Sequence, residues 1–369
     1  MTESASNARA YIVIVNWNGW RDTIECLESV FRIIQDNFSV IVCDNDSKDG
    51  SIERIVEWAK GNLIAVPALD QMKSLSAPPV TKPVPFVLLE VSQLEDPQAC
   101  SGEARLILIR SRKNLGFAGG NNLGLRYILR RNDHEYVWLL NNDTVVHPKS
   151  LACLIDRMKE DMRIGICGSK LCFYSVPHLV QAYGGSAYNP LTGRNHHIGI
   201  SNPASVQEDR ASVERQLGYI LGASMLISRD FLDHVGLMNE DYFLYYEEID
   251  WVTRAKGKFL QGYAPGSIVF HKHGSSLGGN WPTRGNASEE SFTISDFYSV
   301  RNQIRFTRRY HPHYLPVVAI TISIRLLKRI VAGKTKRVRS VLRGVASAFT
   351  GKPVDPPVDL AGSLTEGKI

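Results

Sequence analysis

Residues 11–19 read YIVIVNWNG. An unbroken apolar run rich in β-branched side chains is followed by Asn-Trp-Asn-Gly, whose residue types favour a turn. Because the run is continuous and does not alternate with polar residues, it predicts a strand covered on both faces, as in a parallel sheet. Three further stretches have the same form and also predict strands: SVIVC from Ser39, LILIR from Leu106 and YVWLL from Tyr136.

Helical periodicity occupies the stretches between these strands. Apolar residues recur at steps of three and four in three groups, which are Ile24, Leu27, Phe31 and Ile34; Ile52, Ile55, Val56 and Ala59; and Leu151, Leu154, Ile155 and Met158. The alternation of strand and helix predicts an α/β fold, a Rossmann-like domain with a mainly parallel central sheet.

Changes in composition divide the chain into segments. Residues 11–280 form the predicted main domain, and the polar residues 1–10 before it are expected to be disordered. Residues 66–105 hold six prolines and little periodicity, so we expect an insertion that is partly ordered at best. Residues 281–350 are predicted to be helical and basic, and residues 351–369 a disordered tail.

The overall composition is that of an ordinary globular protein. The chain has 369 residues, is 44% hydrophobic and 22% charged, and carries a net charge of +6. So mild an excess of positive charge does not indicate a nucleic-acid partner. Six cysteines without a C-x-x-C pair predict buried free thiols. No apolar run reaches the ~18 residues of a spanning helix, so we expect a cytoplasmic domain.

Apolar and basic residues interleave near the C-terminus, in VVAITISIRLL from Val317 and KRIVAGKTKRVRSVLRG from Lys328. This pattern favours a helix lying on an anionic membrane surface, which would make the protein peripheral on the inner face of the cytoplasmic membrane. A basic helix packed on the domain and a nucleic-acid patch are the alternatives. No nucleic-acid reader motif accompanies the segment, so we expect no nucleic-acid partner.

Polar residues follow three of the four predicted strands directly. They are Asn16-Trp17-Asn18-Gly19, Asp44-Asn45-Asp46-Ser47 and Asn141-Asn142-Asp143-Thr144. In a doubly wound sheet, ligands bind beyond the carboxyl ends of the strands, where these residues would meet. Any one such group could be ordinary turn chemistry, but three at one edge predict a binding site.

These segments, taken in order, resemble family 2 glycosyltransferases of the GT-A fold. The resemblance rests on VIVNWNG, VIVCDNDSKDGS, NLGFAGGNNLGL, VWLLNNDT, GASMLISRDFLDHVGLMNEDYFLYYEEIDWVTRA and VFHKHGSS. It covers roughly residues 11–276 without the proline-rich insertion, and within the family it is most similar to the rhamnosyltransferase-like branch. It implies an inverting enzyme that moves one sugar, such as rhamnose, from a dTDP- or UDP-linked donor to a glycan or lipid-linked acceptor in bacterial surface polysaccharide synthesis.

The resemblance also implies a set of nucleotide-binding residues. Asp44 matches the family acid that hydrogen-bonds the nucleobase, and a carboxylate there suits the imide N–H of uracil or thymine. Asn16 matches a position near the base and ribose. The remaining candidates come from two segments. Asn114, Gly116, Gly120 and Asn122 lie in the glycine-rich segment at the start of a helix, where negative charge is favoured. Asn141 and Asn142 directly follow the fourth strand.

A divalent metal, Mg²⁺ or Mn²⁺, follows from the same resemblance. Asn141-Asn142-Asp143 stands where the family carries its Asp-x-Asp metal motif. Asp143 is then the expected direct ligand, since hard cations prefer oxygen, and His271 matches a family histidine that completes the site. Asn141 replaces the first Asp and is expected to contact ribose or a metal-bound water.

The acidic cluster in YFLYYEEIDW matches the family position of the base that takes the acceptor's proton. Glu248 is the predicted base and Glu247 the second candidate. Asp250 is expected to orient Arg254 or the acceptor, and Ser224 lies in a segment that resembles an acceptor-side loop. Without the resemblance, the cluster reads as an acid-rich helix N-terminus. A non-catalytic nucleotide-sugar-binding protein or partner subunit is therefore the alternative function.

Overall fold

The structure is a computed structural model, and it describes residues 8–96, 98–272 and 289–350. The expected disorder of residues 1–7 and 351–369 lies outside the described residues. Residues 8–10 are described and ordered: Ala8 is buried and the first strand begins at Ala10.

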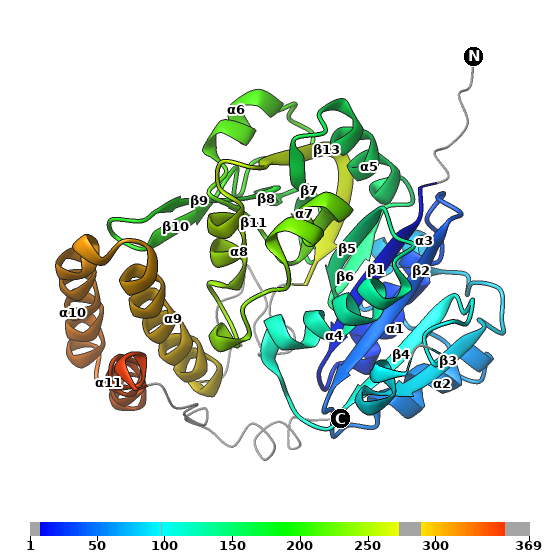
Figure 1. Ribbon diagram of the computed structural model, residues 1–369, viewed down its shortest axis with the longest axis horizontal. Coiled ribbons are helices and arrows are strands. Elements are labelled where there is room, and N and C mark those ends of the chain that lie inside the picture. The colour runs from blue at the N-terminus through cyan, green and yellow to red at the C-terminus, as the bar shows by residue number, and fades with distance from the viewer. Residues whose placement is uncertain (1–7, 97, 273–288, 351–369) are drawn as a thin grey trace.

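A ten-stranded sheet forms the centre of the molecule (Figure 1). Nine strands follow one another in the order β3 (Phe86–Glu90), β4 (Leu106–Ser111), β2 (Phe38–Asn45), β1 (Ala10–Asn16), β5 (Tyr136–Asn141), β12 (Ser224–Ser228), β7 (Ile164–Phe173), β13 (Leu260–His271) and β6 (Thr144–Val146), and β8 (Val180–Tyr183) pairs with β7. The first five are all parallel, and the remainder are mixed. The four strands predicted from sequence, and the α/β class with a mainly parallel sheet, are confirmed.

Helices cover both faces of the sheet and explain why the strands are apolar throughout. The side chains of Ile12 and Ile14 point to one core with α1 (Trp20–Val30), α2 (Ser51–Lys60) and α5 (Ser150–Glu160). Those of Tyr11 and Val13 point to the other core with α4 (Gly116–Arg131), α7 (Arg229–Val235) and α8 (Glu247–Ala255). The residues of a central strand such as β2 are therefore all buried, whichever way they face.

The proline-rich insertion is more ordered than the sequence indicates. It contains β3 and the short helices η1 (Asp70–Met72), α3 (Lys73–Ser76) and η2 (Val91–Glu95). The residues FVLLE of β3 add a parallel edge strand to β4, and Met72 packs with Val145 and Tyr174. Prolines surround these elements without preventing them. The first helix is shorter than predicted, because it ends at Val30 and leaves Ile34 exposed.

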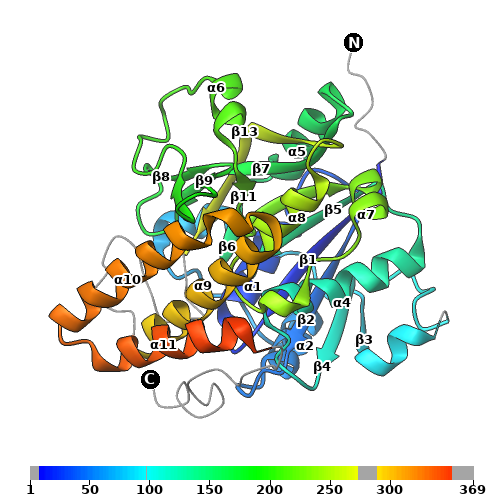
Figure 2. The ribbon, with the colours of Figure 1, turned by 60° about the vertical axis from the view of Figure 1, so that its left-hand side comes forward.

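The C-terminal part of the described chain is a three-helix unit with its own apolar core, at the left of Figure 1 and towards the viewer in Figure 2. Its helices are α9 (Glu289–Tyr310), α10 (Leu315–Val331) and α11 (Thr335–Phe349), with the short helix η5 (Pro312–Tyr314) between the first two. Beside it lies a small sheet of β9 (Gly185–Asn189), β10 (Arg194–His197) and β11 (Tyr219–Ile220); α6 (Arg210–Gln216) precedes β11 in the chain.

Candidate functional site

The carboxyl ends of β2, β1 and β5 bring the predicted polar residues to one edge of the sheet. Asn16 pairs in register with Asp44, and Val15 with Asn141. The Asn16 amide donates to Asp44 Oδ1 at 2.8 Å and to Ser47 Oγ at 3.0 Å. Burial raises the pKa of the Asp44 carboxyl, against the opposing effect of these hydrogen bonds. The structure thus places Asp44 and Asn16 together, as the sequence predicts.

Asn142 stabilises the position of Asn16 through Thr23. Its amide is buried and donates to Thr23 Oγ1 at 3.1 Å, and Thr23 donates to Asn16 Oδ1 at 2.8 Å. A Cβ at Gly19 would lie 2.7 Å from the Asn142 amide nitrogen, so the backbone of the first turn packs directly on this side chain. Asn142 therefore holds Asn16 in place and is not itself turned towards a ligand.

The glycine-rich start of α4 makes close contacts with the protein. A Cβ at Gly120 would lie 2.7 Å from Val15 Cγ1, so this glycine allows the helix to approach β1. Gly116 has φ +70° and would place a Cβ 2.2 Å from the Phe243 carbonyl oxygen. Asn114 Oδ1 accepts from the Gly116 N–H at 2.9 Å. These geometries serve packing and turn formation.

Asn122 also has a structural role. Its side chain is 1% exposed, donates to the Met238 carbonyl at 2.9 Å and to Glu240 at 2.8 Å, and accepts from the Met238 N–H at 3.1 Å. These contacts use the amide fully. We therefore do not retain Gly116, Gly120 and Asn122 among the proposed nucleotide contacts.

Asp143 and His271 meet next to Asn141. His271 Nε2 lies 3.2 Å from Asp143 Oδ1 and 3.4 Å from the Asn141 amide nitrogen. His271 Nδ1 lies 3.0 Å from Gln181 Oε1, so a proton on Nδ1 would be donated to Gln181 and Nε2 would be the ligating nitrogen. Within the described ranges, no group of three or more His, Cys, Asp and Glu side chains could hold a metal ion.

The two adjacent glutamates differ in their surroundings. Glu248 Oε1 accepts from the Gly222 N–H at 3.2 Å, and the residue lines a cavity that also reaches Asn141 and His271. Glu247 is 2% exposed, and its Oε2 has no hydrogen-bond partner in the described part of the chain. Burial raises the pKa of both carboxyls, and the charge of Glu248 raises that of Glu247 further. Only Glu248 is in a position to meet a ligand.

A strained turn precedes these glutamates. Phe243, Tyr245 and Tyr246 all have positive φ, at 65°, 68° and 79°, a conformation that non-glycine residues adopt only when held there. The amide nitrogen of Asn302 on α9 lies 2.8 Å from the carbonyl oxygens of Tyr242, Leu244 and Tyr245. Asn302 is fully buried. The C-terminal helices therefore fix the start of α8.

Asp250 and Ser224 are occupied inside the protein. Asp250 is fully buried and binds the Arg254 guanidinium at 2.9 Å and the Tyr310 hydroxyl at 2.7 Å. The geometry agrees with the prediction that Asp250 orients Arg254. It does not agree with a contact between Asp250 and the acceptor, because Asp250 is fully buried. Ser224 is fully buried, accepts from Trp138 Nε1 at 2.9 Å and contacts Ser169 Oγ at 2.7 Å. An acceptor cannot reach it, because it lies within the sheet.

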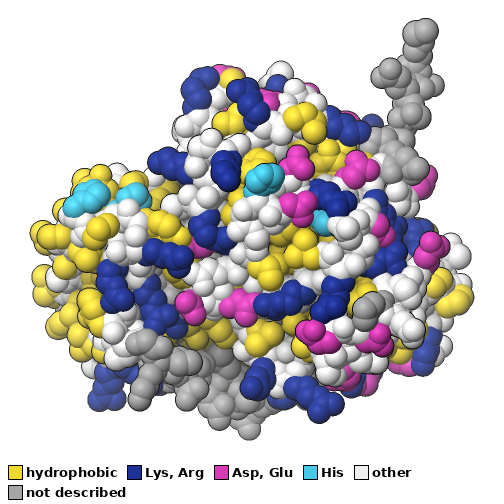
Figure 3. Space-filling view, viewed as in Figure 1, with side chains coloured by type: hydrophobic (Ala, Val, Ile, Leu, Met, Phe, Trp, Pro, Cys, Tyr) yellow, Lys and Arg dark blue, Asp and Glu magenta, His cyan; other side chains and the backbone are white. Residues whose placement is uncertain are grey.

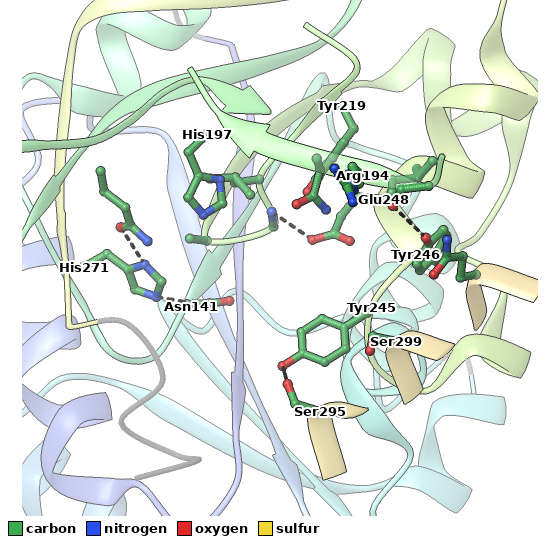
Figure 4. Close-up of a pocket in the computed structure, with 18 of the residues that line it drawn as sticks. Asn141, Arg194, His197, Tyr219, Tyr245, Tyr246, Glu248, His271, Ser295 and Ser299 are labelled. Atoms are coloured by element: carbon green, nitrogen blue, oxygen red, sulfur yellow. Dashed lines mark hydrogen bonds between the residues drawn. The ribbon is translucent and has the colours of Figure 1, made fainter. Parts of the chain in front are cut away.

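A cavity of about 590 Å³ joins several of these groups (Figure 4). Asn141 and His271 line one end, and Glu248, Tyr246 and Ser299 lie at the other. Asp143 does not line the cavity but contacts His271, which does. Asp44, on β2, lies two strands from Asn141, on β5, at the same edge of the sheet. The sequence did not single out Gln181, Arg194, His197, Ser299, Asn302, Gln303 and Arg325, which line or support this cavity.

Comparison with known proteins gives a consistent assignment. The family described as "Glycosyl transferase family 2" matches residues 11–68 and 91–234, more than half of the chain. The low-salt glycan biosynthesis hexosyltransferase Agl10 of Haloferax volcanii is 27% identical over 176 residues, which are 46% of this chain and 53% of that protein. The N-acetylglucosaminyl-diphospho-decaprenol L-rhamnosyltransferase of Mycobacterium tuberculosis is 27% identical over 154 residues, 39% of this chain and 49% of that protein.

The chain spans about half the length of these curated relatives. Among solved structures, it is similar to the mannosyltransferase PcManGT of Pyrobaculum calidifontis in complex with GDP-Man and Mn²⁺, at 15% identity and a TM-score of 0.46, with 92% of this chain and 86% of that chain covered. The family match, which includes the ends of β1, β2 and β5, confirms the resemblance seen in the sequence. This chain belongs to glycosyltransferase family 2.

Proposed function

We propose that this protein is an inverting glycosyltransferase that transfers one sugar from a nucleoside-diphosphate sugar to an acceptor hydroxyl. The observation that carries the proposal is a single cavity lined by Glu248 at one end and by Asn141 and His271 at the other. In a one-step displacement with inversion, the acceptor attacks the anomeric carbon from the side opposite to the departing diphosphate. The base and the diphosphate-binding residues must therefore lie at opposite ends of one space. Family membership supports the same reaction class.

The nucleotide would lie along the carboxyl edge of the sheet. Asp44 would bind the base, held in place by the buried Asn16 amide, and a carboxylate at Asp44 suits the imide N–H of uracil or thymine. Neighbouring strands lie about 4.8 Å apart, so the two-strand step from Asp44 to Asn141 is roughly 10 Å. That is about the span of a nucleoside, which would bring the diphosphate to Asn141 and Asp143.

The residues at Asp143 fit a Mg²⁺ or Mn²⁺ ion that shares its coordination with the donor. Asp143 Oδ1, in the turn just before β6, and His271 Nε2, at the end of β13, lie 3.2 Å apart, and Gln181 orients the imidazole. Two protein ligands suit these ions, which commonly keep waters and take phosphate oxygens as the remaining ligands. When bound, the ion would stabilise the negative charge that develops on the departing diphosphate.

Glu248 would act as the general base. The acceptor oxygen forms a bond to the anomeric carbon as the bond from that carbon to the diphosphate oxygen breaks, and the electron pair leaves with the diphosphate. The hydroxyl proton passes to Glu248. The Gly222 N–H holds Glu248 Oε1, and burial raises the pKa of the carboxyl towards the range useful for a base at neutral pH.

Two features support a lipid-linked acceptor, with rhamnose as the donor sugar. The mycobacterial relative is named for L-rhamnose transfer to a diphospho-decaprenol acceptor. In addition, α10 exposes an apolar stripe at helical spacing, in which Ile320 is 60% exposed and Leu327 59% exposed. Figure 3 shows apolar side chains gathered over the three-helix unit with Lys and Arg beside them.

This apolar and basic surface would dock on an anionic membrane. Besides Ile320 and Leu327, the exposed residues of α10, of α11 and of the loop between them include Ile324, Lys328, Ile330, Val331, Lys334, Lys336, Arg339, Leu342 and Arg343. Apolar side chains would enter the headgroup region while the cations meet anionic lipids. No helix among the described residues is long and apolar enough to cross a bilayer, so contact through this face would be peripheral.

Glu248→Gln and Asp143→Ala test the proposal together. With a donor found by screening nucleotide sugars, Glu248→Gln should bind the nucleotide as the wild-type protein does and lose about 10²–10⁴-fold in kcat. Asp143→Ala should weaken nucleotide binding in the presence of Mn²⁺ but not in its absence. Wild-type turnover by Glu248→Gln would contradict the proposed base. Nucleotide-sugar binding without transfer by the wild-type protein would favour the non-catalytic alternative.

A further inference from the structure

Two arginines line the end of the cavity that lies beyond Glu248. Arg194 comes from β10 and Arg325 from α10, which belong to different parts of the chain. Figure 4 shows Arg194 and Glu248 on the same side of the cavity, with His271 and Asn141 on the other. Arg325 donates to Ser299 Oγ at 3.2 Å, and Ser299 lines the same end. The cations therefore lie away from the end proposed for the donor diphosphate.

These arginines have no carboxylate partner in the described part of the chain. Asp296 on α9, whose charge acts on Arg325, is bound at 2.7 Å by both Arg329 and Arg337. Among the described residues, no ion pair within 4.0 Å involves Arg194 or Arg325. Burial lowers the pKa of the Arg325 guanidinium, and the charges of Arg329 and Arg194 lower it further, with Tyr246 and Asp296 opposing.

Burying a cation without a counter-ion costs desolvation free energy. A guanidinium is the side chain best suited to bind a phosphate group, because it can donate two hydrogen bonds to it. Arg329, one turn further along α10, is satisfied by a carboxylate, while Arg325 faces the cavity with one neutral hydroxyl. Arg194 is exposed and can adjust to a ligand. The pair therefore has the chemistry of an anion site built into the cavity wall.

We propose that Arg194 and Arg325 bind a phosphate group carried by the acceptor. This inference rests on the proposed function, because it uses Glu248 as the point where the acceptor hydroxyl reacts. The acceptor sugar would then lie at Glu248 with its phosphate at the arginines, on the side away from the donor. The positive charge at this end would select acceptors that carry phosphate over neutral glycans.

The same helix offers a path for a lipid attached to that phosphate. Arg325 faces the cavity, while Ile320, Ile324 and Leu327 of α10 are exposed on the outside. A lipid-linked phosphate held at Arg325 would have its chain beside the surface proposed to meet the membrane. A soluble glycosyl phosphate would use the same arginines without this surface.

The test measures phosphate binding with the donor site already filled. The full chain is saturated with UDP and Mg²⁺ and then titrated, by calorimetry, with inorganic phosphate and separately with farnesyl phosphate. Arg325→Gln and Arg194→Gln are each expected to weaken phosphate binding on the order of ten-fold while leaving UDP affinity unchanged, because one charge-assisted pair is lost. Arg112→Gln is the control. It also removes one positive charge, but the Arg112 side chain is 86% exposed and does not line the cavity.

Equal phosphate affinity in the wild-type protein and in both arginine variants would overturn the proposal. Arg325→Lys should recover part of the affinity, and Arg194→Gln changes an exposed residue, so a folding defect in Arg325→Gln would not obscure the result. Tighter binding of farnesyl phosphate than of inorganic phosphate identifies a lipid-linked acceptor, and equal binding identifies a soluble one. Failure of the wild-type chain to bind UDP would instead count against the proposed donor site, and phosphate titration without UDP would still test the arginines.

Discussion

Replacing Asn302 by leucine is expected to slow sugar transfer while leaving nucleotide binding intact. Asn302 lies on α9 and contacts neither the proposed donor site nor the sheet edge. Its amide nitrogen lies 2.8 Å from three backbone carbonyl oxygens, those of Tyr242, Leu244 and Tyr245. These residues belong to the turn with positive φ that leads into Glu247 and Glu248. The substitution therefore acts on the base through the backbone that positions it.

The size of the effect follows from the hydrogen bonds removed. The amide has two N–H donors, each contributing about 1 kcal/mol net, and a buried carbonyl left unpaired costs about 1–3 kcal/mol more, so the native turn should be destabilised by about 3–5 kcal/mol. That is comparable with the strain of the three residues at positive φ, at about 1–3 kcal/mol each. A relaxed turn would displace Glu248, and a misplacement of ~1 Å can cost about 10²-fold in rate.

The assay compares kcat, KM for the donor and UDP affinity in Asn302→Leu with those of Thr307→Val. Thr307 is the matched control, since it lies fully buried on the same helix and its hydroxyl has no hydrogen-bond partner in the described residues. Asn302→Leu should lower kcat at least about ten-fold with little change in UDP affinity, and Thr307→Val should lower neither. A folded Asn302→Leu protein with wild-type kcat would refute the positioning role of this side chain.

Three other variants, two single and one double, give distinct outcomes. Glu247 has a raised pKa because of burial, so its stabilising contribution is complete below its ordinary value of 4.5 and is lost as the pH rises through the folded-state value. Glu247→Gln should therefore raise the melting temperature relative to the wild-type protein at about pH 8 but not at about pH 4, and transfer should persist; loss of transfer would make Glu247 the base. Gln181→Leu should weaken Mn²⁺ binding roughly ten-fold by freeing the His271 ring, and unchanged binding would exclude that orienting role. Ile320→Asp combined with Leu327→Asp should abolish sedimentation with anionic liposomes, whereas Ile64→Asp, which changes an equally exposed residue on another part of the surface, should not; equal sedimentation of both would contradict docking through α10.

The sequence predicted the strands and the acids that follow them because those signals are local. A continuous apolar run such as YIVIV specifies a strand in the middle of a sheet, and Asp44 directly follows another such run. The proline-rich insertion was harder, because the five residues of β3 become a strand only through pairing with β4. Tertiary pairing overrides a weak local pattern.

The residues that complete the site could not be predicted from local pattern. Gln181 and Asn302 are ordinary polar residues in their own segments, and they gain roles only where the fold brings them to His271 and to the turn before α8. At Gly120, in contrast, the local pattern suggested a functional role where the structure shows a packing role. Its local sequence suggests a phosphate-binding loop, but the close contact that requires glycine is with Val15.

We propose above all that Asp44, Asp143, His271 and Glu248 act on one bound donor. A crystal structure of the full chain with UDP and Mn²⁺, in which the anomalous signal of manganese locates the metal, tests this most directly. The metal is predicted to be bound by Asp143 and His271, with uracil at Asp44 and the diphosphate facing the cavity that Glu248 lines. A metal bound elsewhere, or a nucleotide on another face of the sheet, would contradict the account.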